Sequence, residues 1–197
     1  MKKIFILKLF LTFYLTNFNI AYSISPDVFI QSTVNRASQL LSKDISKEEK
    51  MDQLELIAKE TVDISGIGFY SLGSARESLN ENQKKIYSNL FEKYFLKSFA
   101  SRLAEYTNPE IEVKNKEVLN KNYTLVSSVL ISTKERPEVN INWRVYTKNP
   151  DNPLIRDLII EGLSLARTQK EEFSSVLNSN DGDIKALFKV LEDFSKN

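Results

Sequence analysis

Two acidic residues in the last quarter of the chain, Asp157 and Glu161, have the types and spacing that could do chemistry. They lie on one face of an expected strand, and paired carboxylates act as acid and base in glycoside hydrolysis. The alternative is structural: Glu161 would hydrogen-bond backbone groups around a turn at Gly162, and Asp157 would pair with a neighbouring cation. We favour the structural alternative because the pair sits where a strand must turn.

The remaining composition offers little else for catalysis. The 197-residue chain has no histidine and no cysteine, which removes the commonest general base, the Ser-His-Asp triad and most zinc sites. Gly66-Ile67-Gly68 is not a phosphate loop, because no strand precedes it and no Gly-Lys-Ser/Thr follows. We therefore expect no enzyme activity, no metal site and no other cofactor.

The carboxylates belong to a predicted strand–turn–helix segment. From Leu154 the pattern has period two: Ile155, Asp157 and Ile159 point one way, and Leu158 and Ile160 the other. Gly162 then allows a turn, and Ser164 is an expected N-cap for a helix to Leu177. A strand that is apolar on both faces must be covered on both sides.

Earlier in the chain, helical spacing and capping residues predict four helices. The longest begins with Asn80-Glu81-Asn82-Gln83, continues to about Tyr106 and has apolar residues over a wide arc, so we expect it to be central. The other three helices are expected at residues 25–42, from Ser46 onward, and from Asp63 to about Gly73.

The period then changes from 3.6 to two, which predicts four strands joined by short turns. Short connections imply antiparallel hairpins. Two closing helices follow, so the chain is predicted to be an α+β domain with the sheet covered on one face. The expected strands are residues 111–119, 123–133, 138–148 and 154–161, and the closing helices are residues 164–177 and 184–194.

The segment with Asp157, Glu161-Gly162-Leu163-Ser164 and then Phe173 resembles the signature of the MlaC family of periplasmic phospholipid-binding proteins, also described as toluene-tolerance auxiliary components. Leu72-Gly73 and the aromatic helix from Gln83 onward are similar to further family features in the same order. The chain departs from the family pattern at Arg156, where a tyrosine is usual, and at residues 74–76, where aromatics are usual.

The resemblance implies helices wrapped around a curved antiparallel four-stranded sheet of the nuclear-transport-factor-2-like kind, which encloses an apolar pocket for acyl chains. Residues of these types could equally pack against one another in a filled core. On the resemblance, the expected lining is Phe69, Leu72, Leu90, Phe91, Tyr94, Phe95, Phe99, Leu103, Val126, Val139, Ile141, Trp143, Val145, Leu158, Ile160, Leu163 and Phe173.

Residues 1–23 are expected to be a cleaved signal peptide, and residues 24–197 a single lipid-binding domain. Two lysines precede an apolar stretch, and Ala21 and Ser23 supply the small residues at −3 and −1. The alternative is an uncleaved anchor, but Asn17 and Asn19 shorten the apolar stretch below the roughly 20 residues that span a bilayer. Cleavage would leave a formal charge of −2 instead of +1, which argues against a nucleic-acid partner.

By resemblance, the protein is expected to be a monomeric periplasmic carrier of glycerophospholipid. Its partners would be an outer-membrane lipoprotein complex and an inner-membrane ABC transporter with an MCE-domain subunit, and its role would be to maintain outer-membrane lipid asymmetry. Two alternatives remain open: an exported nuclear-transport-factor-2-like enzyme that uses Asp157 and Glu161, and a packed interaction module without a cavity.

Overall fold

A computed structural model describes residues 23–196, so the expected signal peptide lies almost wholly outside the described residues. The described chain is a mixed α+β structure of six α-helices and a five-stranded antiparallel sheet. Its elements, in order, are α1 (Pro26–Leu41), α2 (Lys47–Thr61), α3 (Ile64–Ser71), the 3-10 helix η1 (Gly73–Glu77), α4 (Glu81–Leu103), β1 (Ile111–Asn120), β2 (Tyr123–Leu130), β3 (Val139–Tyr146), β4 (Leu154–Ile160), β5 (Leu163–Ser164), α5 (Leu165–Asn178) and α6 (Ile184–Lys196).

Side-chain caps fix where the predicted helices begin. The side chain of Ser46 accepts from the backbone N–H of Glu49, whose carboxylate accepts from Ser46 in return, and Asn80 and Gln83 form the same reciprocal pair at the start of α4. Asp63 caps α3 by accepting from the Gly66 N–H. Helix α4 ends at Leu103, earlier than the sequence pattern predicts.

The sheet has the simple order β1-β2-β3-β4-β5, with every neighbouring pair antiparallel. The predicted count of four strands is therefore one short. Strand β5 has only two residues and pairs with β4 through a hairpin whose two turn residues are Glu161 and Gly162. Both have positive φ, 48° and 84°, as a tight two-residue hairpin turn requires.

Cross-strand register decides which side chains share a face of the sheet. On β2 the buried residues are Thr124, Val126, Ser128 and Leu130, and the face that carries them is here called the inner face. The sequence left the orientation of this strand open, because Leu125, Val129 and Ile131 are equally apolar. Pairing across β2 and β3 fixes it, since residues directly opposite one another point the same way.

One predicted orientation on β4 is wrong. Ile155 was expected to share a face with Asp157, but it pairs with Val145, whereas Asp157 pairs with Arg144. Arg156 is therefore an extra residue opposite the Arg144–Val145 step, a β-bulge. The bulge returns Ile155 to the inner face, where it is buried with Val145 in the core.

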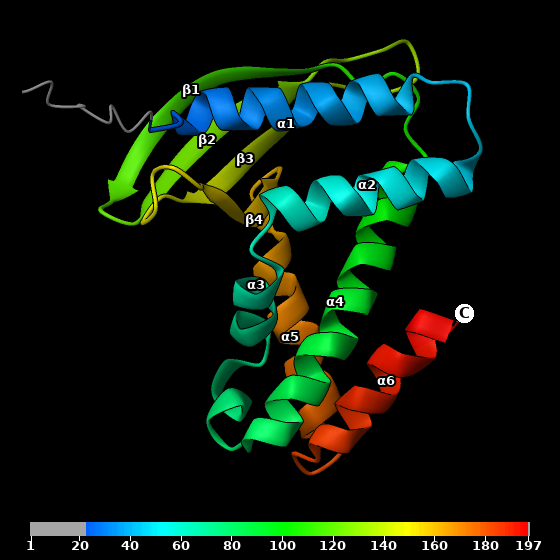
Figure 1. Ribbon diagram of the computed structural model, residues 1–197, viewed down its shortest axis with the longest axis vertical. Helices are drawn as coiled ribbons and strands as arrows, with labels where there is room; N and C mark the ends of the chain where they lie inside the picture. Colours follow the sequence, from blue (N-terminus) through cyan, green and yellow to red (C-terminus); the bar gives the residue numbers. More distant parts are fainter. Residues whose placement is uncertain (1–22, 197) are drawn as a thin grey trace, which may run out of the picture.

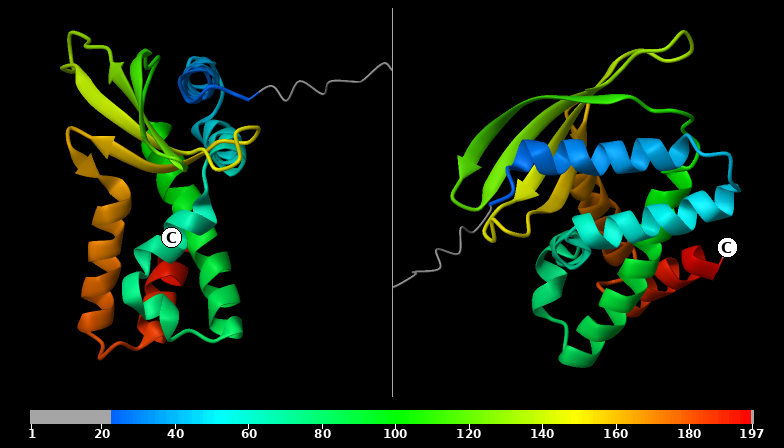
Figure 2. Two further views of the ribbon diagram at one scale, coloured as in Figure 1. Left: turned by 90° about the vertical axis from the view of Figure 1, so that its left-hand side faces the viewer. Right: turned by 45° about the horizontal axis from the view of Figure 1, so that its top comes forward.

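The helices form two groups around this sheet. Helix α1 lies along β1 and β2 (Figure 1). Its Asp27 pairs with Lys116, which lies opposite the inner-face residue Val126. Helix α4 packs on α2, α3 and α6, whereas α5 descends from β4 and contacts α3 and α6 (Figure 2). The sheet thus sits at one end of a helical layer and curves over α1 (Figure 1).

The buried side chains form two clusters. The larger one joins α1, α3, α4, α5 and α6 to the inner face of the sheet, and the smaller one joins α1, α2 and the end of α4 around Leu54 and Ala100. Within residues 23–196, no helix combines the length and apolarity needed to cross a bilayer.

Candidate functional site

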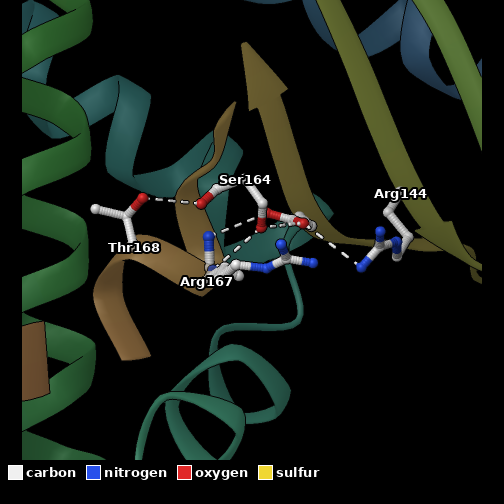
Figure 3. A network of polar contacts seen from close by, with 6 residues as sticks. Arg144, Ser164, Arg167 and Thr168 are labelled. Carbon is white, nitrogen blue, oxygen red and sulfur yellow. Dashed lines mark hydrogen bonds and ion pairs between the residues drawn. The ribbon is translucent and has the colours of Figure 1, made fainter. Parts of the chain in front are cut away.

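Asp157 lies in the middle of β4 and is hydrogen-bonded to the start of α5, where Figure 3 shows Ser164, Arg167 and Thr168. Its side chain is 2 % exposed and accepts two hydrogen bonds, from the Ser164 hydroxyl at 2.7 Å and from the Ala166 N–H at 3.0 Å. The Arg144 guanidinium lies 3.6 Å away. A carboxylate at the first turn of a helix also interacts favourably with the helix dipole. Asp157 therefore fixes the start of α5 on the sheet.

Ser164 shares this task. Its hydroxyl donates to Asp157 and accepts from the Arg167 N–H at 3.1 Å, so it is the N-cap that the sequence predicts. Glu161 anchors the other end of the hairpin: its N–H donates to the Asn140 carbonyl, and its carboxylate accepts from the backbone and side-chain N–H groups of Asn140 on β3.

These contacts support the structural interpretation of the carboxylate pair. Both Asp157 oxygens accept hydrogen bonds inside the protein, and Glu161 holds the turn to the neighbouring strand. Neither carboxylate lines either of the two surface grooves described below. The motif builds a rigid strand–turn–helix corner. In residues 23–196, no group of three or more acidic, histidine or cysteine side chains is placed to hold a metal ion.

Arg156 has a role that sequence reasoning missed. The bulge places its side chain beside Tyr146, with the guanidinium 3.8 Å from the centre of that ring. It also donates to the Tyr123 hydroxyl at 2.7 Å and to Asp63 at 2.6 Å, and Asp63 is the cap of α3. Arg156 thereby ties α3 to two strands. In the sequence, Arg156 stands out only because the family usually has a tyrosine at this position, and this difference does not reveal its contacts.

The seven predicted lining residues on β2, β3 and β4 all fall on the inner face. Val126, Trp143 and Leu158 lie opposite one another in one row, and Ile141 and Ile160 continue the next. Val139 and Val145 lie two residues to either side of Ile141 and Trp143 and share their face. The Trp143 indole N–H donates to the Ser128 hydroxyl at 2.8 Å, so the ring can lie in apolar surroundings with its polar group satisfied.

Helix α4 supplies a second apolar surface, a ladder of stacked aromatic rings. Tyr87, Phe91, Phe95 and Phe99 recur every fourth residue, and consecutive ring centres are 5.7, 6.0 and 5.7 Å apart. Tyr87 and Phe91 are fully buried, whereas Phe95 and Phe99 are half-buried. Gly68 makes room for this ladder, because a Cβ there would lie 2.7 Å from the Phe91 ring.

The Tyr87 hydroxyl is also satisfied internally. It donates to the Gly68 carbonyl at 2.8 Å, and burial raises the pKa of this hydroxyl. Tyr94 lies off the ladder and donates to the Gln169 side chain at 3.0 Å, which links α4 to α5. Burial raises the pKa of Tyr94 too.

The predicted lining residues differ in solvent access. Those that are buried are Leu72, Phe91, Val126, Ile141, Val145 and Phe173. Those that are half-buried are Phe69, Leu90, Tyr94, Phe95, Phe99, Leu103, Val139, Trp143, Leu158 and Ile160. Leu163 is 60 % exposed. The half-buried group includes members of both the α4 ladder and the sheet rows.

Six of these residues lie outside the larger cluster: Leu103, Leu163 and the four sheet residues Val139, Ile141, Leu158 and Ile160. Leu103 packs against the smaller cluster of α1 and α2, and Leu163 lies at the edge of the sheet in β5. Phe91, Phe95, Phe99 and Trp143 belong to or pack against the larger cluster that contains Val126 and Val145. Phe173 also belongs there, with its ring edge-on to Phe91 at 6.1 Å.

Two grooves lie on the surface elsewhere. One, of about 560 Å³, lies between α3 and α5 and includes Tyr70, Arg167 and Lys170; the other, of about 600 Å³, lies between α2, α4 and α6. Charged and polar side chains predominate in both, and neither is lined by a predicted lipid-binding residue.

The sequence and the fold were both compared with those of known proteins. No curated protein matches the sequence. A solved structure of a phospholipid-binding protein from Ralstonia solanacearum, in complex with a phospholipid, has a similar fold, with a TM-score of 0.73 at 17% sequence identity over 88% of this chain and 98% of that chain. The family model described as MlaC protein matches residues 31–193, most of the chain. The chain therefore belongs to the MlaC protein family.

Proposed function

We propose that this protein is a carrier that binds glycerophospholipid by its acyl chains, between the inner face of the sheet and the aromatic ladder of α4. The observation that carries this proposal is membership of the MlaC family, over residues 31–193. The similar fold from Ralstonia solanacearum was solved with a phospholipid bound, which supports the same ligand class.

The arrangement of apolar side chains supports the location. Seven predicted lining residues share one face of the sheet. The half-buried Phe95 and Phe99 pack against the hydrophobic cluster that contains Val126 and Val145 of this face. A core residue gains most by complete burial, so large apolar side chains that keep solvent access mark a surface suited to a hydrocarbon guest.

Energetics explain why such a carrier needs an apolar interior more than polar contacts. Exposing a methylene to water costs about 0.8 kcal/mol, so one acyl chain of about 16 carbons would cost on the order of 12 kcal/mol. A shuttle must therefore offer surroundings nearly as apolar as the membrane, or extraction stalls. The headgroup can remain in water.

We propose further that residues 1–23 direct export and are removed, which leaves residues 24–197 as a monomeric periplasmic domain of the nuclear-transport-factor-2-like kind. The carrier would exchange lipid between an outer-membrane lipoprotein complex and an inner-membrane ABC transporter with an MCE-domain subunit, and so help maintain outer-membrane asymmetry. This proposal rests on family membership and on the sequence pattern of residues 1–23. No catalytic step is included.

Native mass spectrometry tests lipid binding directly. Protein purified from the periplasm of an expressing cell is expected to carry a co-purifying two-tailed phospholipid. Trp143→Asp places a charge in the centre of the inner-face rows and is expected to abolish that load, whereas Asp151→Asn, in the exposed β3–β4 turn, should retain it. Bare wild-type protein would contradict the proposal, as would a full lipid load in a folded Trp143→Asp variant.

A further inference from the structure

The apolar surface of the sheet reaches the solvent at the β4–β5 hairpin. Ser128, Ile141, Ile160 and Leu163 lie opposite one another on β2, β3, β4 and β5, so their side chains form one row on the inner face. Exposure increases along the apolar part of this row: Ile141 is 6 % exposed, Ile160 is half-buried and Leu163 is 60 % exposed.

Leu163 is held firmly in this position. The Glu161 carboxylate and backbone bind Asn140 on one side of the turn, and Ser164, the residue after Leu163, binds Asp157 at 2.7 Å on the opposite face. An exposed leucine side chain is unfavourable in water, and a ligand that covers it lowers the free energy because the apolar surface is then removed from water. Its fixed place at the end of a continuous apolar row distinguishes it from scattered surface leucines, which need no explanation.

We propose that Leu163 marks the entrance through which acyl chains reach the inner face, at the junction of the sheet with α5 (Figure 2). This inference rests on the proposed function and adds the route. A tail leaving a membrane first covers Leu163, then passes Ile160 toward Ile141 and Trp143. Each step replaces water by apolar side chains, so the path has no polar barrier to cross.

The two surface grooves offer poorer routes. The α3–α5 groove is lined by Arg167, Lys170, Glu171 and several hydroxyl and amide side chains. The α2–α4–α6 groove is lined by charged residues of α2 and α4. A hydrocarbon chain would have to displace water from these groups without replacing their hydrogen bonds.

The absence of cysteine from the chain allows a test on folded protein. Leu163→Cys introduces a unique thiol, which is modified after folding with a bulky poly(ethylene glycol) maleimide. Leu56→Cys is the matched control, because Leu56 is 58 % exposed but lies on α2, away from the row. The measured quantity is the rate at which delipidated protein takes up a self-quenched fluorescent phospholipid from vesicles of phosphatidylethanolamine and phosphatidylglycerol.

We expect modification at position 163 to slow uptake about tenfold or more relative to the unmodified Leu163→Cys protein, whereas modification at position 56 should leave the rate of Leu56→Cys nearly unchanged. Equal rates for the two modified proteins would overturn the entrance, even though the carrier function would stand. A wild-type protein that takes up no phospholipid would refute the proposed function and the entrance together.

Discussion

At the scale of single residues, the most informative side chain is a buried carboxylate whose contacts join a strand to a helix. Asp157 has three polar neighbours, the Ser164 hydroxyl, the Ala166 N–H and the Arg144 guanidinium, and each fits a structural purpose. The acid in the family signature is thus explained by the need to join a strand and a helix at a fixed angle. Function depends on it indirectly, through the place it gives to the hairpin.

Replacing Asp157 with asparagine should therefore destabilise the protein. The amide keeps the shape of the carboxylate but loses the charge, and one of its two polar atoms can no longer accept a hydrogen bond. We expect a loss of about 1–3 kcal/mol in the free energy of unfolding, because a buried donor that loses its acceptor is costly. Urea unfolding measures this loss. Asp151→Asn in the exposed turn should change stability by less than about 0.5 kcal/mol, and equal effects of the two substitutions would disprove the structural role.

At the scale of elements, α1 protects the outer edge of the sheet. The Gln31 side chain donates to the Ile111 carbonyl at 3.3 Å and accepts from the Val113 N–H at 3.1 Å, so it occupies the place of a neighbouring strand. An unprotected edge strand is a template for aggregation. Farther along β1, residues 114–120 are exposed, including Val118.

Hydrogen exchange can test this protection at one amide. In Gln31→Ala the Val113 N–H loses its acceptor, and its exchange should accelerate, with a stability loss of about 1 kcal/mol. Gln39→Ala is the control, since Gln39 lies exposed on the same helix and the helix-propensity change is identical. Acceleration at Val113 in both variants would indicate general destabilisation of α1 instead.

The N-terminal end of α1 is tied to β1 by a charge pair that should respond to pH. Hydrogen bonds from Lys116 and Ser25 lower the pKa of Asp27 from 3.8 to about 2. Because the folded-state pKa lies below the unfolded value, the contribution is present above about pH 4 and is lost as the pH falls toward 2. The Asp27 side chain is 36% exposed, so we expect less than about 1 kcal/mol.

Comparing the wild type with Asp27→Asn measures the contribution of the Asp27–Lys116 pair to the free energy of unfolding. At pH 7 the variant should be slightly less stable in urea unfolding, and the difference should shrink between pH 4 and pH 2. Added salt should reduce it as well. A difference that is constant over this pH range would show that the pair does not contribute through ionisation.

The accuracy of the sequence predictions follows the range of the interactions involved. The caps at Ser46, Asn80 and Ser164 were predictable, because a cap is formed by residues three apart in the chain. The orientation of β2 and the bulge at Arg156 were not, because both depend on register with β3, which is set by tertiary pairing. Strand β5 was missed since two residues carry no periodicity.

The same distinction applies to the site. Alternation predicted that Ile141 and Trp143 share one face of β3, and the register with β2 agrees with this. Which face of the sheet lines a pocket could not be deduced from alternation. The positions of Leu103, in the smaller cluster, and of Leu163, at the exposed edge, could not be deduced, because they depend on how α2 and the hairpin are placed. That these residues contact lipid remains a prediction.

At the scale of the whole molecule, the proposed lipid site lies next to the main hydrophobic cluster of the fold. The rings of α4, part of the inner face of the sheet around Val126 and Val145, and α1 meet in a single hydrophobic cluster. A phospholipid between these walls would bury apolar surface of both guest and protein. Binding and folding should therefore be coupled, because a ligand that binds the native state alone stabilises it by mass action.

Removing the lipid should accordingly lower the thermal midpoint. The delipidated protein is obtained by unfolding, removal of the lipid and refolding. It is expected to melt about 5–10 °C below protein to which lipid is added at about 100 times its dissociation constant. Differential scanning fluorimetry with and without added phospholipid measures the shift. Trp143→Asp is expected to show its own midpoint with no shift on lipid addition, because the charge blocks the apolar surface while leaving the outer face and the corner at Asp157 unchanged. A shift of equal size in this variant would show that the lipid binds outside the inner face. No shift in the wild type would show that this protein has the family fold but does not bind the phospholipid.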